Sequence, residues 1–253
     1  MPNNELKNKV DVYFNNYKRK VAETSKKYLM EVTFHEIRLK ESIYWISDIM
    51  EKNCNIEKVL FIGESTVMDW CLNQLGIIPI EKIDVTTFEL RETFPMDHEK
   101  YDLVVCTEVL EHLKDRNDTQ RDIFNFSGAL NLINESSRVL KRGGLFFLTT
   151  PNLSCAKAIC RLILGKSPYF WIHHVREYTP AEVRYMLERA NFKIEKINTI
   201  DTWANRWHTG DNPFLEFNIK WEKNESIIMN FLKENSFTTD LRDDTMFILA
   251  RKH

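Results

Sequence analysis

The first 55 residues show a helical pattern of apolar and polar positions. Apolar side chains recur every three or four residues, and charged residues fill the other faces, which predicts two helices within residues 5–52. These apolar positions are Val10, Tyr13, Phe14, Tyr17, Val21, Ile37, Ile43, Tyr44, Ile46, Ile49 and Met50. We therefore expect a helical cap over residues 1–55 and a main domain over residues 56–253.

The pattern changes at Lys58, where short apolar runs begin to alternate with helical segments. Strands are predicted at 58–63, 80–85, 101–107 and 145–150, and a turn at the glycine pair of 141–144. Helices are predicted at 66–75, from Glu108 onward, and within 118–140. Strands that alternate with helices indicate crossover connections and a mostly parallel sheet, so the fold class is α/β.

Beyond Pro151 the alternation is interrupted twice. Residues 153–178 read as a helix followed by a loop, and residues 201–240 are irregular and rich in aromatic residues. Thr179 and Pro180 have the pattern of a helix start, which predicts a helix to Ala190. Strands follow at 192–200 and 245–250. We interpret 153–178 and 201–240 as lid insertions, because insertions on a rigid α/β scaffold commonly supply specificity.

Composition narrows the class of protein. The chain has 253 residues, 43% hydrophobic, with a formal net charge of −2, so no strong basic field favours a nucleic-acid partner. Its five cysteines are odd in number and none form a CxxC pair, which argues against a disulfide framework or a structural zinc site. No apolar run approaches the ~18–20 residues that span a bilayer. We expect a cytoplasmic protein.

Four segments together resemble the class I S-adenosylmethionine (SAM)-dependent methyltransferases. The similarity covers residues 56–200 and 243–252, and it is closest to a bacterial subgroup associated with small molecules and surface sugars. The segments are YDLVVCTEVLEHL (101–113), LKRGGLFFLTTPN (140–152), HVREYTPAEVRYMLERANFKI (174–194) and DDTMFILARK (243–252). Their order and spacing make the resemblance specific.

The resemblance implies a Rossmann-like sheet of seven strands, the last antiparallel, with SAM at the carboxyl ends of the first strands. Carried over by position, the cofactor-binding residues are Ile62, Gly63, Glu64, Ser65, Asp84, Val85, Cys106 and Thr107. Asp84 is placed to bind the ribose hydroxyls, although an aspartate there can also simply begin a turn.

The first loop departs from the family pattern. Related proteins have a GxGxG turn there, whereas this chain has Gly63 followed by Ser65 and Val67. Glycine lets backbone approach a ligand closely, and side chains crowd that approach. Either the turn has another geometry, or SAM binding is weakened or lost.

Three side chains after the 101–107 strand share one face of the predicted helix. Glu108, Glu111 and His112 stand at i, i+3 and i+4, at the sheet edge where ligands bind. Two carboxylates and an imidazole suit Mg²⁺ or Mn²⁺. The alternative is that the acidic residues only favour the positive end of the helix.

The pattern E-x-x-E-H, followed by H-x-x-E-Y-T, resembles the RNA 3′-terminal ribose 2′-O-methyltransferases. That resemblance implies metal ligands at Glu108, Glu111, His112 and His174. The rest of the chain does not resemble an RNA enzyme, so we carry over the metal site and not the substrate. Arg176 is the alternative positive partner of the two carboxylates.

The expected reaction is O-methylation of a sugar or sugar-linked group, as in surface polysaccharide biosynthesis. An alcohol needs activation, which a metal provides as a Lewis acid and a histidine provides as a base. The candidate bases are His112, His174 and His173, and candidate acceptor contacts are Arg176, Tyr178, Trp203 and His208. Aromatic side chains in an insertion can equally be packing. The alternatives are a phosphoryl or nitrogen acceptor, or a non-catalytic binding protein with a degenerate SAM loop.

Overall fold

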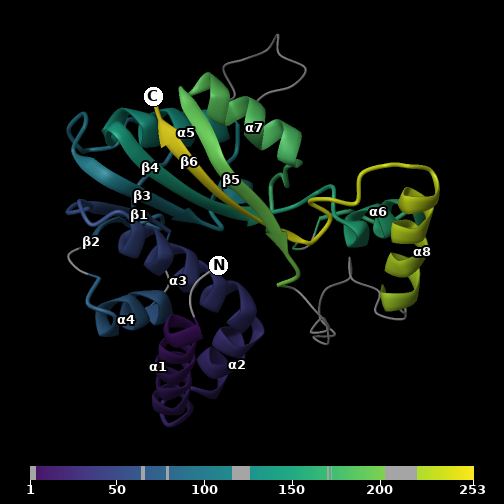
Figure 1. Cartoon of the computed structure of the whole chain (residues 1–253), viewed down its shortest axis with the longest axis horizontal. Coiled ribbons are helices and arrows are strands. Elements are labelled where there is room, and N and C mark those ends of the chain that lie inside the picture. Colours follow the sequence, from purple (N-terminus) through teal and green to yellow (C-terminus); the bar gives the residue numbers. More distant parts are fainter. Residues whose placement is uncertain are drawn as a thin grey trace.

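A mixed six-stranded sheet forms the centre of the part of the chain described by the computed structural model, which comprises residues 4–63, 66–77, 80–115, 126–169, 171, 173–202 and 221–253. Its strand order is β2-β1-β3-β4-β6-β5, and only β6 runs antiparallel to its neighbours (Figure 1). The strands are β1 (Val59–Ile62), β2 (Ile80–Ile83), β3 (Tyr101–Thr107), β4 (Leu140–Pro151), β5 (Phe192–Ile200) and β6 (Thr245–Lys252). The strand order reverses at β1, which places a ligand-binding crevice at its carboxyl end.

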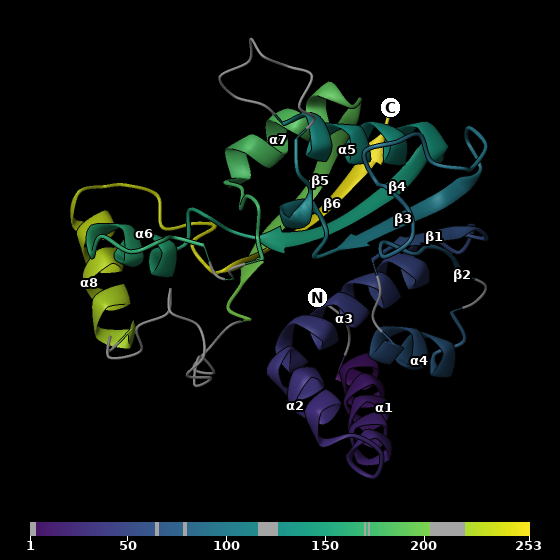
Figure 2. The same cartoon turned by 180° about the vertical axis from the view of Figure 1, so that it is seen from behind.

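Helices cover both faces of this sheet. The helices α5 and α7 lie on one face, and α3 and α4 lie on the other with α1 and α2 beyond them (Figures 1 and 2). The helices are α1 (Asn4–Ala22), α2 (Lys26–Phe34), α3 (Glu36–Lys52), α4 (Thr66–Gln74), α5 (Ser127–Val139), α6 (Ala156–Ile163), α7 (Pro180–Arg189) and α8 (Trp221–Glu234). Among the described helices, none is both long and apolar enough to cross a membrane.

Alternation along the strands fills two cores. In β1, Leu60 and Ile62 enter the cluster under α5 and α7, whereas Val59 and Phe61 enter the cluster under α3 and α4. On the second face, Trp45 of α3 stacks on Phe147 of β4 with ring centroids 5.6 Å apart. The N-terminal helices therefore share one hydrophobic core with the sheet, and α3 is bound directly to it.

The resemblance implies seven strands, but the described sheet has six. Residues 84–100, between β2 and β3, form turns in place of a strand. The amide of Phe88 donates to the carbonyl oxygen of Asp84, and the segment buries Leu90 and Phe94 in the core. Because this segment turns directly after β2 and its apolar residues fill the core, it contains no extended stretch that could pair with β2 at the sheet edge.

Three local expectations are wrong. The N-terminal region has three helices in place of two, because Ser25 caps α2 by accepting a hydrogen bond from the amide of Tyr28 (3.2 Å). Residues 141–144 continue strand β4 and form no separate turn. No α-helix begins at Glu108, which has a left-handed φ of 55° and precedes a single 3-10 turn, η1 (Leu110–His112).

The helices α6 and α8 pack together beyond the carboxyl end of β4 (Figure 2). One buried lysine attaches α6 to the sheet: Lys157 Nζ lies 2.8 Å from Asp244 Oδ2 and 2.7 Å from Asp201 Oδ1. The Asp244 side chain is fully buried, where an uncompensated charge would be costly. The lysine and several hydrogen bonds compensate that charge.

Lys157→Met is expected to lower the free energy of unfolding by about 2 kcal/mol, because it removes a charged hydrogen-bond donor from the buried Asp244 carboxylate. Denaturant unfolding measures this change. Lys233→Met, at an exposed lysine of α8, is the control and should change stability by less than about 0.5 kcal/mol. Equal stability of the two variants would show that the pair does not hold α6 in place.

Candidate active site

A cavity of about 490 Å³ lies between the carboxyl ends of β1 and β3 and the helices α2 and α3. Its lining combines the first loop, the segment after β3 and the N-terminal helices. The lining residues are Tyr28, Glu31, Val32, His35, Arg38, Leu39, Ser42, Gly63, Thr66, Val67, Met68, Val85, Thr107, Glu108, Val109, Glu111, His112, Trp171 and His174. Three of the residues predicted for the cofactor, Gly63, Val85 and Thr107, thus meet the four residues predicted for the metal at one cavity.

Gly63 forms the turn at the end of β1. Its φ of 103° lies in a region that side chains rarely adopt. A Cβ atom there would lie 2.8 Å from Val109 Cγ2 and 3.1 Å from the carbonyl oxygen of Thr107. The glycine is therefore required by the close approach of the segment after β3, whatever ligand it contacts. Glu64 and Ser65 lie outside the described residues.

The other predicted cofactor residues are distributed around the cavity. Asp84 follows β2, and its Oδ1 accepts hydrogen bonds from Thr86 N (2.8 Å) and Thr86 Oγ1 (2.6 Å), which lower its pKa. Val85 and Thr107 line the cavity, whereas Ile62 and Cys106 are buried in the core. Asp84 does begin a turn, as the alternative interpretation expects; its side chain is exposed and does not line this cavity.

Val85 also lines a second cavity of about 470 Å³, which lies between residues 85–90 and the segment 108–113. The two cavities share Val85, Glu108, Val109 and His112. Because they share these lining residues, the two cavities are adjacent and extend from the first loop to the turn after β2.

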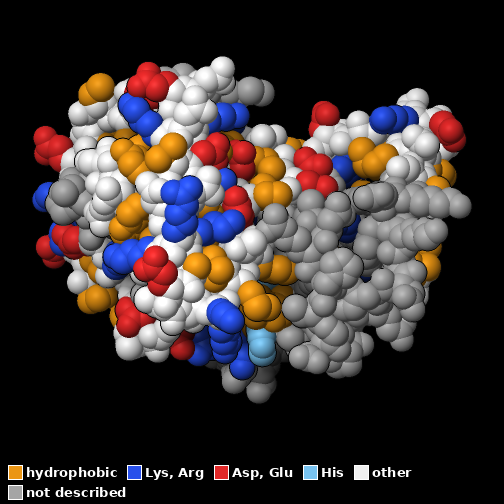
Figure 3. Space-filling model, turned by 90° about the horizontal axis from the view of Figure 1, so that it is seen from below, with side chains coloured by type: hydrophobic (Ala, Val, Ile, Leu, Met, Phe, Trp, Pro, Cys, Tyr) orange, Lys and Arg blue, Asp and Glu red, His pale blue; other side chains and the backbone are white. Residues whose placement is uncertain are grey.

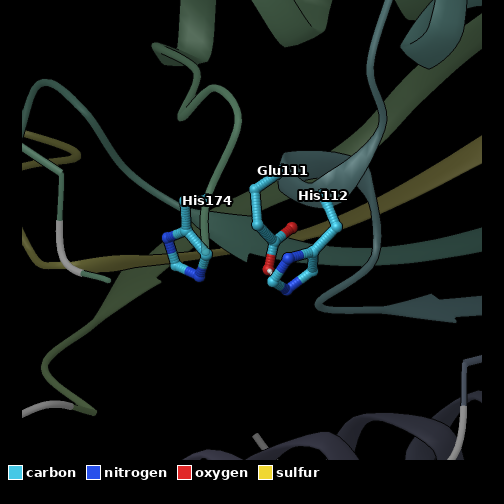
Figure 4. Close-up of side chains that lie close together, drawn as sticks. All are labelled: Glu111, His112 and His174. Atoms are coloured by element: carbon cyan, nitrogen blue, oxygen red, sulfur yellow. Dashed lines mark ion pairs between the residues drawn. The ribbon is translucent and has the colours of Figure 1, made fainter. Parts of the chain in front are cut away.

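Three predicted metal ligands come together at the first cavity. One ligand atom each from Glu111, His112 and His174 lies within 4.8 Å of the other two. Figure 4 shows the side chains of η1 and of the loop before α7 pointing toward one another. Two backbone hydrogen bonds join these segments, from the amides of Val175 (2.8 Å) and Arg176 (3.2 Å) to the carbonyl oxygen of Glu111.

The Glu111 carboxylate is fully buried. Its Oε2 accepts a hydrogen bond from Thr150 Oγ1 at 2.9 Å, and its Oε1 has no hydrogen-bond partner among the described residues. Burial, followed by the charge of Glu108, raises the pKa of Glu111 well above its ordinary value. A carboxylate in this position is stabilised by a cation.

The two histidines present unprotonated nitrogen to the cavity. Burial lowers the pKa of His174 to about 4, and burial together with the nearby His174 lowers the pKa of His112. His112 Nδ1 lies 3.2 Å from the carbonyl oxygen of His173, and the rings of His112 and His174 are 5.0 Å apart. Both imidazoles are therefore neutral near pH 7, the form that binds a metal or accepts a proton.

Comparison with known proteins assigns the family. The family model described as "Methyltransferase domain" matches residues 40–197, more than half of the 253 residues. The chain belongs to this methyltransferase family. A probable S-adenosylmethionine-dependent methyltransferase of Mycolicibacterium smegmatis is 29% identical over 114 residues, 45% of this chain and 37% of that protein. The chain thus matches little more than a third of the length of this curated relative.

The fold agrees with the family. A SAM-dependent methyltransferase from Archaeoglobus fulgidus superimposes with a TM-score of 0.54 at 15% identity, over 90% of this chain and all of that one. The predicted α/β Rossmann-like methyltransferase fold is thereby confirmed, and so is the prediction of a methyltransferase domain. SAM is the methyl donor that the methyltransferase family implies.

Glu108 also lines the cavity of this methyltransferase, but it is held by a different partner from the three clustered side chains. Its Oε2 is 2.7 Å from Arg38 Nη1 on α3, and its Oε1 is buried with no hydrogen-bond partner among the described residues. The sequence suggested Arg176 as the alternative cation, and that is wrong. Arg176 pairs with Glu182 (2.9 Å) and lies over the ring of Phe126.

Neither of the two predicted acceptor contacts that the structure describes lies at the cavity. Neither Arg176 nor Tyr178 lines it, and Tyr178 is buried in the core. The side chain of His173 is exposed, and only its backbone oxygen approaches His112. Trp203 and His208 lie outside the described residues.

Trp171, Arg38 and His35 line the cavity of the methyltransferase, and sequence reasoning missed all three as site residues. Trp171 is 42% exposed, and its ring lies 6.3 Å from His112 and 6.0 Å from His174. Arg38 stands three residues after His35 on α3, the spacing of a shared helix face. That spacing could have suggested that the two side chains act together, but nothing in the sequence indicates that this helix face lines a cavity.

Proposed function

We propose that this protein is a SAM-dependent O-methyltransferase that activates an acceptor hydroxyl at Glu111, His112 and His174. One observation carries the proposal: Gly63, at the family's cofactor turn, and these three side chains line the same cavity. A methyl donor bound at the turn would therefore have the activating groups beside its reactive end. Holding the reacting atoms in such proximity supplies much of the rate in group transfer.

A divalent cation, Mg²⁺ or Mn²⁺, fits the donor set of this cavity. The residues that would hold it are Glu108, Glu111, His112 and His174. Support comes from the buried carboxylate oxygens Oε1 of Glu108 and Glu111, which lack hydrogen-bond partners among the described residues, and from two neutral imidazoles. When bound, the ion would lower the pKa of the acceptor hydroxyl as a Lewis acid.

The chain's own residues then handle the proton. The acceptor oxygen forms a bond to the methyl carbon, while the sulfur–carbon bond breaks and its electron pair returns to sulfur. Where no metal binds, the hydroxyl proton passes to the neutral imidazole of His112 or His174. The burial of these two groups keeps them unprotonated at neutral pH, as a general base requires. Where both are metal ligands, the proton passes to another base, for which His173 is the candidate.

A hydroxyl-rich acceptor, a sugar or a sugar-linked group, fits the remaining wall of the cavity. Arg38 and Glu108 offer a donor and an acceptor to hydroxyl groups, and the exposed ring of Trp171 offers an apolar surface to a sugar face. On the face shown in Figure 3, basic, acidic and apolar side chains are interspersed. This mixed surface, with a net charge of −2, favours a small acceptor over a polyanion.

The donor is tested by isothermal titration calorimetry with SAM and S-adenosylhomocysteine, and the acceptor by radiolabelled methyl transfer to a panel of sugars. Heat of binding and transfer to a hydroxyl are expected. No heat at millimolar ligand would overturn the enzyme and favour the non-catalytic interpretation. Transfer only to nitrogen or phosphoryl acceptors would overturn the O-methylation.

Asp84→Ala is expected to weaken SAM binding by about 10–100-fold, because a charged hydrogen-bond acceptor for the ribose is lost. Thr86→Val is the matched variant, since it removes one turn hydrogen bond and keeps the carboxylate. Calorimetry compares both with Asp97→Ala, an exposed position outside both cavities. Equal losses in Asp84→Ala and Thr86→Val would mean that Asp84 only holds the turn.

A further inference from the structure

A second buried carboxylate stands behind the site, at Glu177. Its Oε1 lies 2.6 Å from Nδ1 of His174, and the side chains are 0% and 2% exposed, respectively. Glu177 does not line the cavity. Its printed contact is with Nδ1 of His174, a cavity-lining residue, so it acts on the site through His174.

The pair fixes which nitrogen of His174 carries hydrogen. A neutral imidazole has one N–H, and an ionised carboxylate can only accept a hydrogen bond. Arg161 of α6 is 3% exposed, and its positive charge interacts with Glu177, which favours the ionised carboxylate. With Glu177 ionised, the 2.6 Å contact favours the hydrogen on Nδ1, which leaves the lone pair on Nε2.

The backbone around the pair is held on both sides. The amides of Val175 and Arg176 donate to the carbonyl oxygen of Glu111, and the amide of Leu153 donates to the carbonyl oxygen of Tyr178. The backbone that carries His174 and Glu177 is thus joined directly to η1 and to the segment after β4. A carboxylate that accepts from the far nitrogen of a histidine is the usual means of orienting an imidazole whose other nitrogen binds or reacts.

We propose that Glu177 is a positioning residue that holds His174 as the Nδ1–H tautomer with Nε2 facing the cavity. This inference deepens the proposed function and rests on it for the role of His174, but the tautomer itself depends only on the pair. Without Glu177 the ring would be free to place a hydrogen on Nε2, where it would block both metal binding and proton acceptance.

The first test is nuclear magnetic resonance of the full chain labelled with ¹⁵N-histidine, without added metal. Long-range ¹⁵N–¹H correlations distinguish the two tautomers, and His174→Asn identifies the His174 signals among the seven histidines. Wild-type His174 is expected as the Nδ1–H tautomer. A wild-type Nε2–H tautomer would overturn the inference, and this measurement needs no Glu177 variant to fold.

The second test compares Glu177→Ala with Glu177→Gln, whose amide oxygen can still accept from Nδ1. The alanine variant is expected to shift His174 toward Nε2–H, and the glutamine variant to retain Nδ1–H. Glu188→Ala, at an exposed glutamate of α7, should leave the tautomer unchanged. An unshifted tautomer in a folded Glu177→Ala protein would also contradict the positioning role.

Titration with Mn²⁺ alone separates this inference from the proposed function. The Kd for Mn²⁺ is expected to rise about 10–100-fold in Glu177→Ala and to recover in Glu177→Gln. If the wild type binds no Mn²⁺ but shows the Nδ1–H tautomer, the metal proposal fails and the positioning role stands. If Mn²⁺ binds equally to wild type and Glu177→Ala, the positioning role fails while the metal proposal stands.

Discussion

Chelation of divalent cations is expected to lower methyl transfer by about 100-fold or more, because loss of a Lewis acid removes several kcal/mol of transition-state stabilisation. Mg²⁺ or Mn²⁺ should restore the rate. Glu111→Gln should behave like the chelated wild type and should not respond to added metal. The measurement is initial rate of methyl transfer after EDTA treatment and dialysis, with and without added metal.

His174→Ala separates the metal from a simple base. It is expected to lower methyl transfer by about 10²–10⁴-fold under either mechanism, since it removes a ligand or a proton acceptor. Only the metal mechanism also predicts loss of Mn²⁺ binding in this variant. Glu23→Gln, at an exposed position in the turn after α1, is the control. Full activity in EDTA would mean that no metal takes part and that His112 and His174 act as base and acceptor contact.

Gly63→Val is expected to cost about 2–5 kcal/mol of folding stability and to abolish SAM binding. Its Cβ would lie 2.8 Å from Val109 Cγ2, at a φ of 103° that a branched side chain rarely adopts. Left-handed strain contributes about 1–2 kcal/mol, and overpacking contributes about 1–3 kcal/mol. Thermal unfolding and SAM titration measure the two effects.

Gly76→Val is the matched control for this substitution. Gly76 also has a positive φ, 77°, but nothing lies within 4 Å of a Cβ placed there. Gly76→Val should lower the folding stability by about 1–2 kcal/mol through backbone strain alone, without a steric clash. SAM binding should be retained. Similar losses of stability in both variants would show that the approach of Val109 to Gly63 is not required by the fold.

The regular elements could be predicted because their signals are local. The strand 101–107 appears with the predicted bounds, since a buried run of seven residues ends where the polar segment begins. The helix after Thr179 carries the predicted cap: the Thr179 side chain accepts from the amide of Glu182, and the Glu182 carboxylate accepts from the amide of Thr179. Such patterns depend on neighbours a few residues apart, and the printed sequence contains them.

The site could be predicted in its residues but not in its geometry. The spacing of Glu108, Glu111 and His112 suggested one helix face, whereas a left-handed residue and a 3-10 turn bring two of them to His174. The pairing of Arg38 with Glu108 spans 70 residues. No local pattern contains it, because it exists only once α3 packs against the sheet.

The position of α3 has an evolutionary consequence. Its Trp45 is packed against the sheet, while its first turns carry Arg38 and His35 to the cavity. The segment that matches the methyltransferase family begins only at residue 40, so the core of α3 lies mostly inside the match and these two side chains lie outside it. Under the proposed function, sequence change in residues 28–38 would alter the acceptor wall without altering the strands that form the cofactor turn. We therefore expect acceptor preference and cofactor use to vary separately among proteins that share this sheet.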